Sequence, residues 1–195
     1  MTIKQIEAIG NFLTYYRTDL IYINQFQKFK AGKISPEEYI QKNPGSFYSF
    51  LIEYRVVRNF PKGTVNKLLY ETSLWIKSSE SNNVDLFAEK LAETVTNKKV
   101  MASMASKILF LNNPWEIIPM DSLARKTLNQ KENKYSVYKN KLTGFGNENE
   151  LIFENSLNYT NSLTNIIHTE FNDLKDLKLI CKNRIIDKVL WTMGK

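Results

Sequence analysis

Apolar residues recur at steps of three and four positions along almost the whole of this 195-residue sequence. Near its start, Ile6, Ile9, Phe12 and Tyr16 fall on one face of a helix. No segment alternates apolar and polar residues for more than a few positions, as a half-buried strand would. Because 43% of the residues are hydrophobic, such helices can enclose a substantial core. The spacing therefore predicts an all-α fold.

Proline, glycine and polar residues divide this pattern into elements. Ser35 followed by Pro36 and two glutamates is typical of a helix start, because serine caps the helix and proline suits its first position. Residues 131–149 are polar and charged and contain Gly144 and Gly146, so they are predicted to form a mobile loop.

Two central helices, over 84–95 and 100–111, are predicted to form a hairpin through the connection 96–99. A short helix is expected from Ser122 to residue 130. The last third is expected to hold helical segments at 150–158, 160–171 and 183–193.

We expect a single all-helical domain over 1–195, with a cleft between two helical lobes. One sub-lobe is expected to combine 1–82 with 150–195. The other is expected to contain 83–130, which holds the hairpin and any catalytic core.

The sequence is basic, with 27 Lys and Arg against 20 Asp and Glu, a formal charge of +7 and a pI of about 9.3. A basic surface favours a polyanion such as nucleic acid or an anionic membrane. An excess of lysine together with many Asn and Ile also occurs in proteins from AT-rich genomes, so the charge alone leaves the partner open.

Several classes of protein are disfavoured by what the sequence lacks. The single cysteine, Cys181, cannot form an intrachain disulfide or a cysteine-based metal cluster. The first residues do not resemble a secretory signal, and no apolar run is long enough to span a membrane, so a cytoplasmic location is expected. There is no glycine-rich phosphate loop. The only histidine, His168, lies on a helical pattern and is interpreted as a partly buried structural residue.

One carboxylate, Asp121, stands where a loop meets a helix. An apolar helical run ends before Pro114, a short loop containing Pro119 follows, and a new helix is expected from Ser122. A carboxylate at such a junction can cap the helix, and it can also face a cleft and take part in chemistry. The sequence leaves both roles open.

The tetrapeptide Ile118-Pro119-Met120-Asp121 resembles the Pro-Val-Asp-like motif of the helix-hairpin-helix DNA glycosylase superfamily. In that family a helical hairpin and an apolar stretch precede the catalytic aspartate, as residues 84–128 do here. The end of the sequence, 184–191, is similar to the closing helix of small bacterial members.

The resemblance implies that Asp121 is the catalytic residue of an enzyme that acts on duplex DNA as a monomer, with no metal and no cofactor. Such an enzyme flips its target base out of the stack, which requires basic residues for phosphates and aromatic residues for the base. The basic candidates are Lys98, Lys99, Arg125, Lys126, Arg55 and Arg58. The candidates for the base pocket are Tyr54 and Trp115, although the sequence around Trp115 favours a core position over base stacking, and Arg55 and Arg58 suit solvated or ion-paired positions at least as well.

Two departures from the family pattern bear on the mechanism. The family hairpin is usually rich in glycine, whereas the connection 96–99 is Thr-Asn-Lys-Lys. Bifunctional members carry a Schiff-base lysine at a fixed distance before the aspartate, and that position is Ala102 here. The resemblance therefore implies a monofunctional enzyme that uses water.

The expected substrate is a modified or damaged base in DNA. The leading hypothesis is glucosylated hydroxymethylcytosine in phage DNA, which some small bacterial relatives remove as a defence, and oxidised or alkylated purines are the next candidates. The alternative from another class is a non-catalytic helical module that binds nucleic acid or a protein, in which Asp121 is only a helix cap.

Overall fold

A computed structural model describes residues 2–56 and 63–195, and all regular structure in these ranges is helical. The all-α prediction is confirmed for this part of the chain. In the described residues the helices are α1 (Ile3–Lys30), α2 (Pro36–Tyr39), α3 (Phe47–Glu53), α4 (Thr64–Trp75), α5 (Val84–Thr94), α6 (Ala102–Asn112), α7 (Ser122–Thr127), α8 (Tyr135–Glu148), α9 (Glu150–His168) and α10 (Leu177–Met193).

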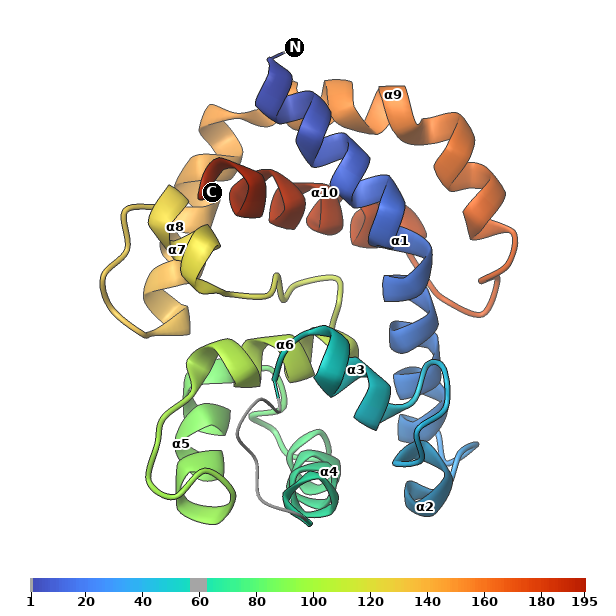
Figure 1. Ribbon diagram of the computed structural model, residues 1–195, viewed down its shortest axis with the longest axis vertical. Coiled ribbons are helices and arrows are strands. Elements are labelled where there is room, and N and C mark those ends of the chain that lie inside the picture. Colours follow the sequence, from blue (N-terminus) through green and yellow to red (C-terminus); the bar gives the residue numbers. More distant parts are fainter. Residues whose placement is uncertain (1, 57–62) are drawn as a thin grey trace.

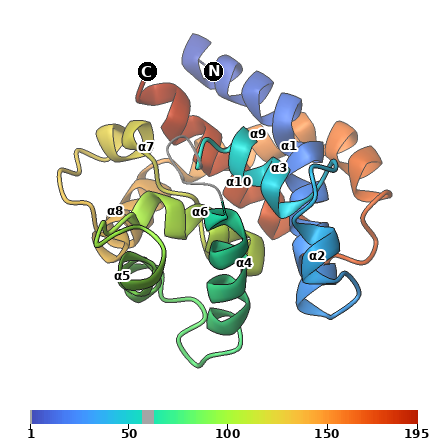
Figure 2. The ribbon, with the colours of Figure 1, turned by 60° about the horizontal axis from the view of Figure 1, so that its bottom comes forward.

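Helices α1 and α10 cross at the centre of the fold and make its largest interhelical contact. Figure 1 shows α9 beside them on one side of the molecule and α3 to α6 on the other. In both views α7 and α8 lie on the same side as α5 (Figure 2). Helix α10 also packs against α7, so residues from the end of the chain reach the segment that contains Asp121.

Local sequence explains where several helices begin. Ser35 accepts a hydrogen bond from the Glu38 N–H and Pro36 is the first residue of α2, which confirms the predicted start. Asn83 caps α5 in the same way. In the ranges 2–56 and 63–195, no helix has the length and apolar character needed to cross a membrane.

The prediction of a mobile loop over 131–149 is wrong, because residues 135–148 form α8. No side chain next to the helix in sequence caps it. Instead Asp85 of α5 accepts hydrogen bonds of 2.6 and 2.8 Å from the N–H groups of Tyr135 and Ser136. Tyr135 and Tyr138 are buried against the core. A cap supplied by a residue 50 positions away has no local sequence signal.

The predicted break between 158 and 160 is also wrong, since α9 is continuous from Glu150 to His168. Three polar residues lie on its buried face, and this made the apolar pattern look interrupted. The hydroxyl groups of Ser156, Thr160 and Thr164 each donate to the carbonyl four residues earlier in the helix. Burial of these hydroxyls is therefore compatible with an unbroken helix.

The two central helices α5 and α6 pack against each other, as the predicted hairpin requires. In the connection between them, Asn97 and Lys98 have φ values of 50° and 64°. Glycine is the usual residue at such positive φ angles, and asparagine is among the residues that tolerate them best. A tight turn without glycine is thus achieved by two consecutive left-handed residues.

Candidate functional site

Asp121 both caps a helix and borders a cavity. It is the N-cap residue of α7, and its Oδ1 atom accepts a hydrogen bond of 2.8 Å from the Ala124 N–H. It also lines a cavity of about 400 Å³ that contains residues from α1, α3, α6 and α10. The capping role and the cleft-facing role, which the sequence leaves open, are therefore compatible in one side chain.

The loop before Asp121 is held by hydrogen bonds from two helices. The Ser106 hydroxyl of α6 accepts from the Met120 N–H at 2.9 Å. The Tyr135 hydroxyl of α8 bonds to both the N–H and the carbonyl of Ile118, each at 3.1 Å. These bonds fix the backbone directly before Asp121, so its carboxylate is positioned in advance rather than carried on a free loop.

The cavity combines three kinds of side chain. Its aromatic residues can pack against a planar group, its cations can bind phosphate, and its carboxylates can stabilise positive charge. The lining residues are Tyr15, Tyr54 and Trp191, then Arg55, Lys107 and Lys188, then Asp19, Glu53, Asp121 and Asp187, with Pro119, Ser122 and Leu123.

A buried ion network includes three residues that line this cavity, Asp19, Tyr54 and Asp187. Arg184, whose side chain is only 1% exposed, pairs with Asp19 at 2.7 Å and with Asp187 at 3.0 Å. Tyr54 donates a hydrogen bond to Asp19, and burial raises the pKa of its phenol, so it stays protonated. Burial also raises the pKa of the Asp187 carboxyl, although Arg184 opposes this. The network fixes Asp19, Tyr54 and Asp187 at the cavity.

Lys188 lies between two aromatic rings of the same cavity. Its Nζ atom is 4.8 Å from the ring centroid of Tyr15 and 6.0 Å from that of Trp191. Burial lowers the pKa of this ammonium group, and the nearby Arg184 lowers it further. On α6, Lys107 also borders the cavity and donates to the Tyr54 carbonyl at 3.0 Å. Both ammonium groups are therefore held at the cavity by specific contacts.

Arg55 reaches the cavity through an unusual backbone conformation. It follows α3 with a φ of 56°, and the Val56 N–H closes the turn by bonding to the Leu51 carbonyl at 2.7 Å. A left-handed residue after a helix is usually glycine, and other residues adopt this region at some cost. The turn places Tyr54 and Arg55 together at the cavity wall.

The structure brings some of the predicted site residues together. Asp121, Tyr54 and Arg55 line one cavity. Trp115 is not among the lining residues, and its indole N–H donates to the Lys175 carbonyl at 2.9 Å, so it does not contribute to this base pocket. Arg58 lies outside the described residues.

The remaining basic candidates in the described residues do not line this cavity. Lys98 and Lys99 are exposed in the connection between α5 and α6, and Lys126 is exposed on α7. Arg125 donates to the carbonyls of Lys131 and Glu132, at 3.3 and 3.4 Å, and thereby ties down the segment after α7.

Sequence reasoning missed the part of the cavity that comes from distant segments. Asp187, Lys188 and Trp191 are on α10, Asp19 is on α1 and Lys107 is on α6. One signal was present, because Arg184, Asp187 and Lys188 are charged residues at helical spacing within an otherwise apolar segment. Charged residues at such positions are buried only when they are paired.

In residues 2–56 and 63–195, no group of three or more His, Cys, Asp or Glu side chains is arranged to hold a metal ion. Comparison with protein-family models, with curated proteins and with solved structures found no match. The chemistry of the site is accordingly inferred from its own residues.

Proposed function

We propose that this protein is a DNA N-glycosylase, similar to the helix-hairpin-helix superfamily, that excises a modified or damaged base and leaves an abasic site. The observation that carries the proposal is the position of Asp121, whose carboxylate borders a cavity lined by aromatic and cationic side chains. The order of hairpin helices, loop and capped helix along residues 84–127 supports it.

The chemistry suits a fixed carboxylate. When an N-glycosidic bond breaks, positive charge develops on the sugar, and a carboxylate held nearby stabilises that charge. The Ala124 N–H holds Oδ1 of Asp121, so the proposal assigns the sugar and the attacking water to the other oxygen, Oδ2. The hydrogen bonds to the preceding loop keep this carboxylate in place without reorganisation during the reaction.

The cavity also has the properties that a flipped nucleotide requires. Its volume of about 400 Å³ lies within the range of roughly 300–1,000 Å³ that is common for small-ligand sites. The aromatic rings of Tyr15, Tyr54 and Trp191 offer surfaces for a base that has left the stack. Arg55 and Lys107 supply positive charge for the flanking phosphates.

The hairpin between α5 and α6 provides a second contact with the DNA backbone in this proposal. Lys98 and Lys99 are exposed there, and the left-handed turn at Asn97 and Lys98 leaves the connection short. Lysine charge would replace the glycine-rich amide cradle of the family in holding a phosphate.

We assign the reaction to water rather than to a lysine. The position of the family's Schiff-base lysine is Ala102, which is fully buried. Lys107 is one turn and a half further along α6, and its ammonium is engaged by the Tyr54 carbonyl. Glucosylated hydroxymethylcytosine in phage DNA is the leading substrate, and oxidised or alkylated purines are the next to test.

The competing function is a non-catalytic module that binds nucleic acid or a protein. One observation favours it, namely that Asp121 does cap α7. Capping alone, however, gives no reason for aromatic, cationic and acidic side chains from four distant helices to meet beside this carboxylate.

An abasic-site assay tests the proposal. Duplex oligonucleotides that carry one modified base are incubated with the protein, and hot alkali then cleaves any abasic site. Wild type is expected to release at least one of these bases, and Asp121→Asn is expected to be slower by about 10²–10³-fold. Asparagine caps helices as well as aspartate does, so the variant loses the charge and keeps the fold.

Glu116→Gln is the matched control, since it also changes an acid to its amide in the loop before α7, but at an exposed position that does not border this cavity. Its rate should equal that of wild type. If wild type binds these duplexes but releases no base from any of them, the binding module is the correct function.

A further inference from the structure

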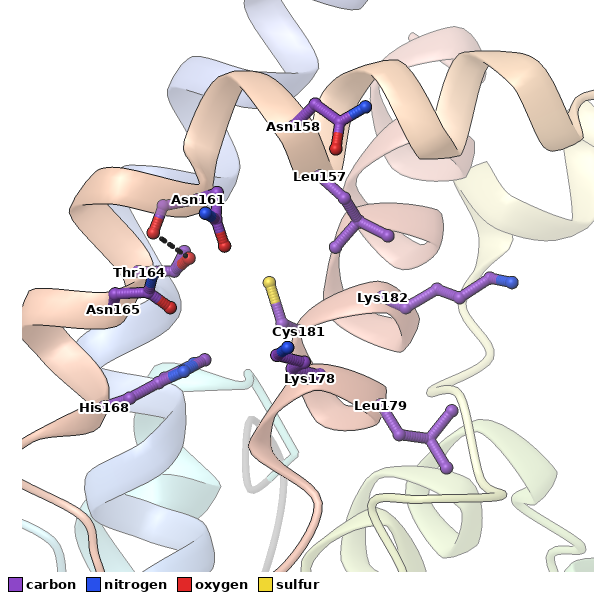
Figure 3. Close-up of a pocket in the computed structure, with 10 residues that line it drawn as sticks. All are labelled: Leu157, Asn158, Asn161, Thr164, Asn165, His168, Lys178, Leu179, Cys181 and Lys182. Carbon is purple, nitrogen blue, oxygen red and sulfur yellow. Dashed lines mark hydrogen bonds between the residues drawn. The ribbon is translucent and has the colours of Figure 1, made fainter.

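A second cavity, of about 390 Å³, lies between α9 and α10 (Figure 3). It shares no lining residue with the cavity at Asp121. Figure 3 shows Leu157, Asn161 and Cys181 directed into the space between the two helices, with Asn165 and His168 further along α9. The proposed glycosylase reaction does not use any of these residues.

The charged side chains that line this second cavity are positive. Lys178 and Lys182 are four residues apart, so they lie on one face of α10. Among the described residues that line it, none is a carboxylate. Two ammonium groups without a nearby counter-charge in the lining favour an anionic ligand, and phosphate is the anion that lysine commonly binds.

The opposite wall is rich in carboxamides. Asn158, Asn161 and Asn165 line it from α9, and all three are exposed. The Thr164 hydroxyl, by contrast, is engaged by its own helix, through the Asn161 and Thr160 carbonyls. A carboxamide offers both donors and an acceptor, which is the pattern needed to pair with the edge of a nucleobase.

His168 adds a fixed polar group at one end. Its Nε2 atom is 2.7 Å from the Tyr16 hydroxyl, whereas that hydroxyl is 3.3 Å from the Leu177 carbonyl. This contact engages Nε2, which leaves Nδ1 as the ring nitrogen that can bond to a ligand. Burial lowers the pKa of the imidazole, and Lys178 lowers it further, so the ring is neutral near pH 7. A neutral imidazole nitrogen can donate to, or accept from, a polar group of a ligand.

We propose that the cavity between α9 and α10 is a nucleotide-binding site. Lys178 and Lys182 bind the phosphate, the asparagine carboxamides bind the edge of the base, and Leu157 flanks the ring. The volume lies within the range of about 300–1,000 Å³ for small-ligand sites. A free mononucleotide and the phosphorylated end of a strand present the same chemistry.

Calorimetric titration of the full chain tests this site. The probes are the four deoxynucleoside 5′-monophosphates, with inorganic phosphate and the deoxynucleosides as half-ligands. At least one monophosphate is expected to bind with a Kd below about 1 mM. It should bind about tenfold more tightly than either half-ligand, because each half-ligand loses one set of hydrogen bonds. If inorganic phosphate binds as tightly as every monophosphate does, the nucleotide assignment is overturned.

Variants locate the binding. Lys178→Gln should weaken the best monophosphate by about tenfold or more, the loss expected for a hydrogen bond to a charged group, and Asn161→Ala by about three- to tenfold, the loss expected for a hydrogen bond between neutral groups. Both residues are exposed, so the fold should survive, and thermal unfolding checks this. Lys175→Gln removes an exposed lysine that is close in sequence but does not line the cavity, and its Kd should equal that of wild type. Equal weakening by Lys175→Gln would show diffuse charge attraction and overturn the proposal.

Cys181 provides an independent readout, because it is the only cysteine of the chain and lines this cavity. A saturating monophosphate should slow modification of its thiol by a disulfide reagent, and inorganic phosphate should not. The same assay with a short 5′-phosphorylated single strand distinguishes a free mononucleotide from the end of a strand as the ligand. If only the strand binds and it protects Cys181, the ligand is a strand end. If neither ligand protects Cys181, the proposal is overturned.

Discussion

Removal of the buried guanidinium of Arg184 is predicted to destabilise the protein strongly. The Arg184 side chain is 1% exposed, and its partners Asp19 and Asp187 are 4% and 14% exposed. Arg184→Met preserves most of the volume but leaves two carboxylates without their buried cation. Breaking a buried ion pair from one side costs about 3–5 kcal/mol, because the remaining charge stays unpaired in a poorly solvated place.

Urea and thermal unfolding measure this loss. For a chain of this size each kcal/mol lowers Tm by about 2–4 °C, so a decrease of about 6–20 °C is expected. Burial already raises the folded-state pKa of Asp187, and loss of the cation should raise it further. A group with a raised folded-state pKa favours folding below its unfolded pKa and loses that contribution as pH rises through the folded pKa. The variant should therefore recover stability as the pH is lowered from 7 toward 5.

The exposed pair Arg17–Glu170 is the control. Its atoms are as close, at 2.6 Å, but the side chains are 56% and 44% exposed. Arg17→Met should cost less than about 1 kcal/mol, because water screens the pair and solvates the partner that remains. An equally small loss in Arg184→Met would contradict this prediction, because it would mean that the buried carboxylates do not depend on this cation.

Three further changes test other parts of the structure. Asp85→Ala should cost about 1–2 kcal/mol and accelerate amide hydrogen exchange mainly in α8, because two N–H groups lose their acceptor; unchanged exchange in α8 would contradict this. Gly194→Ala should cost about 1–3 kcal/mol in urea unfolding, since its Cβ would lie 2.2 Å from the Leu123 carbonyl oxygen, and an unchanged midpoint would contradict the close packing. Burial raises the pKa of Cys181 to about 12, so its alkylation rate should still rise about tenfold per pH unit between pH 9 and pH 10, whereas a plateau above pH 9 would indicate an ordinary thiol.

The helical class was predictable because the three- and four-residue spacing is a local property of the sequence. Errors arose where a helix depends on a distant residue. Helix α8 begins at an N–H group that Asp85 caps from a distant part of the sequence, and its two glycines border open space. No feature close to the helix in sequence therefore indicated that it is ordered. Helix α9 was predicted as two segments because its buried face carries the hydroxyls of Thr160 and Thr164, which interrupt the apolar pattern.

The candidate site was also predictable only where its residues are close together in the sequence. Asp121 was identifiable because a loop, a proline and a capped helix occur within a few residues. The opposing wall of the cavity was not identifiable from the sequence, because Asp19 and Asp187 are 168 residues apart. They become neighbours only through Arg184. Trp115 is the converse case, since it is close to Asp121 in sequence but its indole N–H donates to the Lys175 carbonyl and it does not line the cavity.

The central claim is that the Asp121 carboxylate performs chemistry and does not merely cap α7. The most direct test is the single-turnover rate of base release by wild type and Asp121→Asn on the same modified duplex, with the affinity for that duplex measured alongside. The rate for Asp121→Asn is expected to be lower by about 10²–10³-fold, with affinity and unfolding midpoint unchanged. Base release by Asp121→Asn at the wild-type rate would contradict it.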